Sequence, residues 1–187
     1  MIVELVDSLA LLAEQNMSGV AFLAAYGVTW LICGVLWRRA SERVAAFATL
    51  FQGMVAFPVA LGLSALIGAI GQARPVAEEV TQLSVLIGTS QLLGLPLLIF
   101  LIVKHQYTLV PFAFATITSM HFVLYSWLYQ TPIYIVMAVL ISLGAMTVML
   151  TAPDARRTAG PARVSLLTGG FMLVTAAVFL SIYIIID

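Results

Sequence analysis

His121 is the residue best placed to do chemistry inside an apolar segment of this chain. It lies in SMHFVLYSWLYQTPIY, residues 119–134, among serine, tyrosine and tryptophan side chains. Steps of three, four and four residues place four polar side chains on one face of a helix: Thr118, His121, Tyr125 and Tyr129. An unpaired polar group facing lipid is costly, so we expect this stripe to face the interior of a helix bundle.

A second polar residue, Gln91, is expected near the same depth as His121. A helix rises about 1.5 Å per residue, and both residues lie about ten positions into their apolar segments. We predict that a neutral His121 faces the bundle interior and has a hydrogen-bond partner on the third span, with Gln91 the best candidate. Two interpretations of the stripe stay open, because it either lines a ligand cavity or only locks helices together. The candidate ligand-binding residues are His121, Gln91, Tyr125, Thr118, Tyr129 and Trp127.

Several classes of active site are excluded by residues that the apolar segments lack. They hold no Asp, Glu or Arg, and Lys104 lies at a segment end, which argues against proton coupling, voltage sensing and a two-carboxylate hydrolase. A His-Glu-x-x-His zinc motif and a Gly-x-Ser-x-Gly nucleophile turn are also absent from the sequence. We therefore expect no catalytic residue, no metal and no cofactor. A net charge of zero argues against a nucleic-acid partner.

The composition indicates that lipid surrounds most of the chain. Hydrophobic residues make up 63% of the 187 residues and charged residues only 9%, whereas a soluble domain is about a quarter charged. Six runs reach the roughly 20 apolar residues that a membrane helix needs: 17–37, 45–71, 80–103, 111–130, 132–151 and 164–186. We predict an all-α polytopic membrane protein, a compact six-transmembrane-helix bundle forming one domain over residues 1–187, with the lipid bilayer as its partner.

Local patterns predict further features of this bundle. The first fifteen residues, MIVELVDSLALLAEQ, indicate an amphipathic N-terminal helix that either lies on the membrane surface or extends the first span. Pro58 and Pro96 predict helix kinks, because each proline leaves a carbonyl without its helical donor. Small residues four positions apart, such as Ser64 and Gly68, favour close helix contacts and permit a homo-oligomer.

Three segments resemble an uncharacterised bacterial family of small six-span membrane proteins. They are GMVAFPVALGLSALIG, QLLGLPLLIFLIV and SMHFVLYSWLYQTPIYIVMAVLI. The residues that carry the resemblance are Phe57-Pro58, Pro96 to Ile99, His121-Phe122 and Trp127-Leu128-Tyr129. The resemblance covers spans two to five and implies the fold type and a bacterial origin. It implies no activity, because none is assigned to that family.

The function that these observations favour is non-enzymatic binding or transport of a small neutral or lipid-like molecule at a site near the membrane midplane. One alternative is a membrane scaffold or interaction subunit whose polar midplane is only packing. A second alternative is a lipid-modifying enzyme with His121 as general base.

The charge distribution predicts the orientation of the chain in a bacterial cytoplasmic membrane. Connections one, three and five hold seven of the eight Lys and Arg residues, and the other side holds only one, Arg74. Cytoplasmic loops carry the excess of basic residues, so both termini are predicted to be extracytoplasmic. A reporter that is active only in the cytoplasm, fused after Asp187, should therefore give no signal. A strong signal from that fusion would show the orientation to be reversed.

Overall fold

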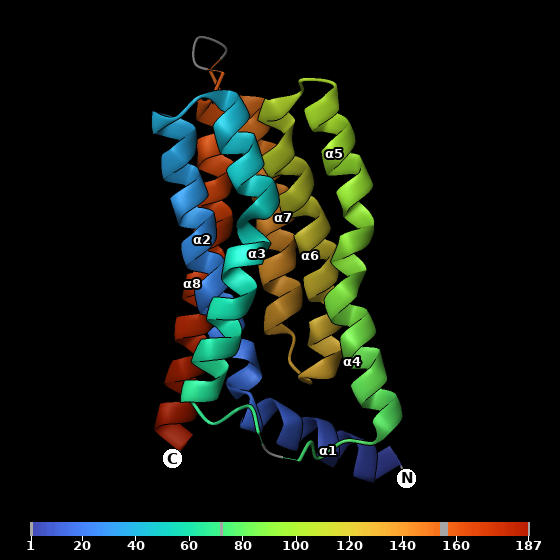
Figure 1. Cartoon of the computed structure of the whole chain (residues 1–187). Coiled ribbons are helices and arrows are strands. Elements are labelled where there is room, and N and C mark those ends of the chain that lie inside the picture. Colours follow the sequence, from blue (N-terminus) through green and yellow to red (C-terminus); the bar gives the residue numbers. More distant parts are fainter. Residues whose placement is uncertain (1, 72, 154–156, 187) are drawn as a thin grey trace.

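A computed structural model describes residues 2–71, 73–153 and 157–186 of the protein, and these residues form helices and no strand (Figure 1). The predicted all-α bundle is thereby confirmed. The α-helices are α1 (Ile2–Gln15), α2 (Val20–Arg39), α3 (Glu42–Leu66), α4 (Glu78–Ser90), α5 (Leu95–Val103), α6 (Val110–Leu128), α7 (Ile133–Thr151) and α8 (Ala159–Ile186). Three short 3-10 helices, η1 (Met17–Gly19), η2 (Gln91–Gly94) and η3 (Tyr107–Leu109), join some of them.

Six helical stretches are long and apolar enough to cross a membrane. They are Met17–Arg39, Glu42–Leu66, Glu78–Val103, Tyr107–Leu128, Ile133–Thr151 and Ala159–Ile185. The chain is therefore a multi-pass membrane protein. Consecutive stretches run in opposite directions, and α4, η2 and α5 together form a single stretch (Figure 1).

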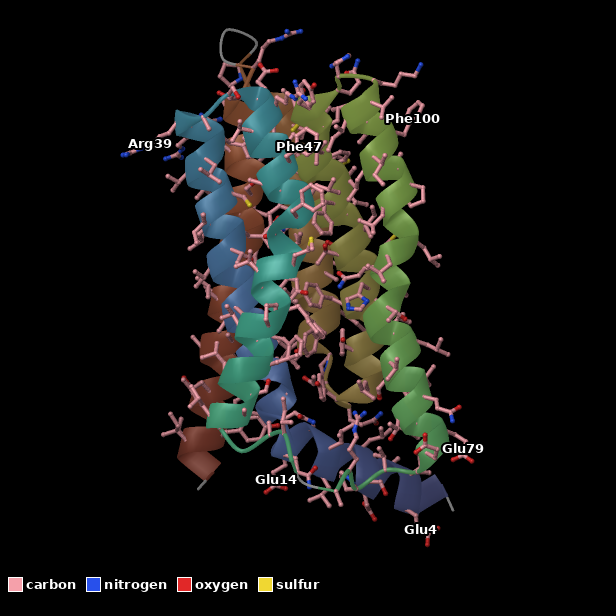
Figure 2. The ribbon with its side chains drawn as sticks, viewed as in Figure 1. Glu4, Glu14, Arg39, Phe47, Glu79 and Phe100 are labelled. Carbon is pink, nitrogen blue, oxygen red and sulfur yellow. The ribbon has the colours of Figure 1, made fainter. Side chains whose placement is uncertain are left out.

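The two ends of the bundle carry different charged residues. Both termini lie at the end where α1 is found, which we call the α1 end (Figure 1). Figure 2 shows Glu4, Glu14 and Glu79 at the α1 end and Arg39 at the opposite end. Arg156 and Asp187, which also entered the charge argument, lie outside the described residues.

The N-terminal helix α1 lies across the end of the bundle and does not extend α2 (Figure 1). The chain turns at Met17–Gly19, where three consecutive residues have left-handed backbone angles, with φ of 46°, 49° and 80°. Leu9 and Leu12 of α1 are buried in a cluster with Val80 and Leu128. We expected this amphipathic helix either to lie on the membrane surface or to extend the first span. In the structure it is separate from the first span.

Helix α3 ends at Leu66, so the expected span over residues 45–71 was too long. Gly68 adopts a φ of 72°, and its N–H donates to the Ala65 carbonyl at 3.1 Å. The Ala69 N–H donates to the Ser64 carbonyl at 2.9 Å. This pair of bonds is a Schellman motif, which terminates a helix although the following residues are apolar.

The two prolines have different surroundings. Helix α3 runs through Pro58 without a break in its assignment. Pro96 lies in the first turn of α5, directly after the 3-10 segment Gln91–Gly94. A proline is tolerated in a first turn because its missing N–H would have no helical partner there. The change in helix type therefore lies just before Pro96, close to the middle of the bundle.

Helices α2 and α8 approach each other closely. A Cβ added to Gly169 would lie 2.6 Å from the carbonyl oxygen of Gly27 and 2.9 Å from the backbone nitrogen of Leu31. Small residues at such contacts let two backbones approach closely in a membrane. Helix α2 also packs extensively against α3, and α6 against α7, whereas α4 packs mainly against α6.

Gly169→Ala should destabilise the protein, because its new methyl group would overlap the backbone of α2. Overpacking of this kind typically costs about 1–3 kcal/mol. Gly170→Ala is the matched control, since nothing lies within 4 Å of a Cβ at that position. Its unfolding midpoint should stay the same or rise, because alanine is the better helix former. Unfolding in a denaturing detergent measures both variants, and equal stabilities would contradict the close α2–α8 contact.

Candidate functional site

A cavity of about 480 Å³ lies beside α4, lined by side chains of α2, α3, α4 and α6. Arg74 from the α3–α4 connection and Tyr134 of α7 complete its wall. Ligand sites in proteins typically measure about 300–1,000 Å³, so the cavity has the volume of a small-molecule site. On α6 the lining extends from Thr118 to Leu128, a distance of about 15 Å at the helical rise. The cavity thus covers about half of a hydrocarbon core of roughly 30 Å.

His121 lies in the wall of this cavity and is 7% exposed. Its Nδ1 is 3.2 Å from the Ser90 Oγ, which is itself 2.7 Å from the Ile87 carbonyl oxygen. A carbonyl only accepts, so the single hydroxyl proton of Ser90 points to Ile87, and Ser90 accepts from the Nδ1–H of the imidazole. In the neutral ring this arrangement makes Nε2 the acceptor nitrogen.

The predicted hydrogen bond between His121 and the third span is confirmed, but its partner is Ser90 and not Gln91, the candidate favoured by depth. Depth along a helix follows from residue counting, but the direction of a side chain around the helix axis does not. Gln91 begins the 3-10 segment and still lines the cavity. Thr118 also lines it, and its hydroxyl donates to the Phe114 carbonyl of its own helix at 2.8 Å.

Three tyrosines form an aromatic cluster at the α1 end of the cavity. The Tyr125 and Tyr129 rings are stacked, with centroids 5.7 Å apart, and the Tyr134 centroid lies 5.8 Å from each. The Tyr134 hydroxyl donates to the Ser18 carbonyl. The Tyr125 and Tyr129 hydroxyls have no hydrogen-bond partner in the part of the chain that the structure describes.

Trp127 is the predicted site residue that the structure does not bring to the cavity. It is 43% exposed and borders a separate, shallow surface hollow with Gln130 and Pro132. Two helical residues correspond to a rotation of about 200°, so Trp127 points away from the side of α6 that carries Tyr125.

Arg74 is the cavity residue that sequence reasoning missed. It is the only charged residue among the described residues of the lining, and no ion pair of its guanidinium occurs within the described ranges. Burial raises the pKa of Tyr129, the neighbouring Tyr125 adds to that rise, and the positive charge of Arg74 acts against it. The available signal in the sequence was that Arg74 is the only basic residue on its side of the membrane.

The lining defines what the cavity can do chemically. It offers an imidazole acceptor, phenol and amide groups, one guanidinium, and apolar walls that include Phe57, Leu61 and Val85. No group of His, Cys, Asp or Glu side chains able to hold a metal ion occurs among the described residues. The arrangement is suited to hydrogen bonding and to burial of an apolar chain.

The bond between Ser90 and His121 can be measured with a double-mutant cycle of Ser90→Ala and His121→Phe. We expect a coupling energy of about 0.6 kcal/mol, the average for interhelical hydrogen bonds in a membrane. The control cycle replaces Ser90→Ala with Ser84→Ala, because the Ser84 hydroxyl donates to the Val80 carbonyl of its own helix at 2.7 Å. Unfolding free energies that are additive in both cycles would contradict the bond.

Residues 10–184 match the Family of unknown function (DUF7010), and the chain belongs to this family. The match confirms the predicted resemblance to a family without an assigned activity, and it extends over the first and last spans as well. No curated protein and no solved structure matches the chain.

Proposed function

We propose that this DUF7010 member binds or transports a small neutral or lipid-like molecule in the cavity beside α4, without catalysing a reaction on it. The ligand-binding residues in this proposal are His121, Gln91, Thr118, Tyr125 and Tyr129. The protein acts in a bacterial cytoplasmic membrane, with the α1 end on the extracytoplasmic side.

The observation that carries the proposal is the set of polar atoms in the cavity wall that lack a protein partner. Buried polar groups in proteins are hydrogen-bonded with few exceptions. The buried exceptions among the described residues are Gln52 and Thr168, and neither residue lines the cavity. The hydroxyls of Tyr125 and Tyr129 also lack a protein partner among the described residues, and they belong to residues that line the cavity, where a ligand atom can reach them. A midplane that served only packing would pair such atoms between helices. Their orientation around one cavity supports a binding site more than a scaffold.

The position of the cavity supports access from the bilayer. Phe57 of α3 and Val85 of α4 both line the cavity, yet they are 50% and 58% exposed on the surface of the bundle. The cavity therefore reaches the surface of the bundle between Phe57 of α3 and Val85 of α4. A lipid-like molecule could enter there without passing through water.

The charge distribution supports the proposed orientation. Glu4, Glu14 and Glu79 lie at the α1 end, and Arg39 lies at the opposite end (Figure 2). Because basic residues collect on the cytoplasmic side, this distribution supports an extracytoplasmic α1 end. The cavity then occupies the outer half of the membrane.

Gly88→Phe tests the proposal by filling the cavity. A Cβ on Gly88 would lie 3.8 Å from the Tyr125 hydroxyl oxygen, so a phenyl ring added there would extend into the space beside it. Purified wild-type protein should carry a small molecule that mass spectrometry detects, and Gly88→Phe should lose most of it. Gly62→Phe on α3 is the control, since nothing lies within 4 Å of a Cβ there and Gly62 is not part of the lining.

The control should retain the molecule at the wild-type level. Full retention by Gly88→Phe, or loss from both variants alike, would contradict a ligand in this cavity. Unfolding midpoints of the three proteins show whether either phenylalanine disrupts the bundle.

A further inference from the structure

We infer that the ligand of this cavity is an amphiphile with an anionic head group, held by Arg74 at the α1 end, with its apolar chain extending toward His121. The inference rests on the proposed function and names the chemical class of the ligand. It concerns carboxylate and phosphate head groups together, because a guanidinium recognises both.

The first argument is the unpaired cation in the cavity wall. Arg74 is the only charged residue in the described lining, and no acidic partner for it occurs in the described part of the chain. Arginine is favoured where a planar carboxylate or phosphate is bound, because two parallel N–H groups meet two oxygens. Arg74 is itself exposed, so an anionic head group can reach its guanidinium and accept a charge-assisted hydrogen bond that is stronger than one to a neutral group.

The second argument is that the charged residue of the described lining lies at one end of the cavity. Arg74, in the connection between α3 and α4, and Tyr129, at the end of α6, both line the cavity at the α1 end. Farther from that end, apolar groups such as Phe57, Val85 and Phe122 line the wall together with the polar but uncharged side chains of Gln91, Thr118 and His121. A head group therefore fits beside Arg74 and Tyr129, where the aromatic hydroxyls can also donate to it. An apolar chain fits the remainder.

The third argument is the direction in which the cavity opens. Its apolar part reaches the bundle surface between Phe57 and Val85, and Arg74 lies at the end of the same cavity. A lipid in the bilayer has this order of parts, with its charged group at the interface and its chain in the hydrocarbon. The ligand can therefore enter sideways with its head group already level with Arg74.

The experiment uses native mass spectrometry of the full-length protein with defined probes. Laurate and dodecyl phosphate carry an anionic head, dodecanol carries the same chain with a neutral head, and acetate and inorganic phosphate are head groups without a chain. The variant is Arg74→Gln. Its matched control is Arg39→Gln, which removes an arginine from the opposite end of the bundle (Figure 2).

We expect wild-type protein to bind laurate and dodecyl phosphate, and Arg74→Gln to bind them about fivefold or more weakly, as loss of a charge-assisted hydrogen bond implies. Dodecanol should bind both proteins equally, and Arg39→Gln should resemble wild type. The two anionic probes distinguish a carboxylate from a phosphate preference.

Three results would overturn the inference. Equal binding of the anionic probes to wild type and Arg74→Gln would show that Arg74 does not recognise the head group. Binding of dodecanol by wild type as tightly as laurate would show that the head group need not be anionic. That result would still agree with the proposed lipid-like ligand. Binding of acetate or phosphate as tightly as the chain-bearing probes would show that the apolar chain does not contribute to the affinity. Failure of every chain-bearing probe to bind wild type would contradict the proposed function itself.

Discussion

The structure depends on a constraint that lipid imposes, namely that helices surrounded by hydrocarbon gain no hydrophobic stabilisation from associating with one another. They associate through close packing and hydrogen bonds between polar groups. The α2–α8 pair shows the first, because Gly27 and Gly169 bring the two backbones together. The α2–α3 pair shows the second, because the Trp37 Nε1–H donates to the Thr49 hydroxyl at 3.0 Å in the buried core. Helix α4 packs mainly against α6, so the space on its other side is left to side chains and to the cavity.

The same constraint separates two kinds of polar residue in the bundle. Short hydroxyl side chains reach a carbonyl of their own helix, as Thr118 and Ser84 do, and such residues need no ligand. A tyrosine hydroxyl lies too far from its own backbone and must find a distant partner. Tyr183 does so at α1, where its hydroxyl donates to the Ala13 carbonyl at 3.0 Å. Tyr125 and Tyr129 instead face the cavity, which explains why the binding proposal centres on them.

Hydropathy was sufficient to predict the helices, because a membrane permits few other structures for an apolar chain. The helical period also placed Thr118, Tyr125 and Tyr129 on the face of α6 that lines the cavity, although their role in binding stays a prediction. Trp127 was grouped with them because of the family resemblance, and its direction around the helix separates it from them. Residue counting does not predict where the helices end or in which direction the Ser90 side chain points around its helix axis, because both depend on local backbone angles. It also does not predict the position of Arg74, because that residue lies in a loop.

The most direct test of the binding account is an electron cryomicroscopy structure of the full chain in nanodiscs made with its native lipids, with a bound antibody fragment to add mass. The account predicts an elongated density between α3 and α4 that begins beside Arg74 and ends near His121. It also predicts that the Tyr125 and Tyr129 hydroxyls contact that density. Helices α3 and α4 packed directly against each other, with side chains filling the cavity, would contradict the account.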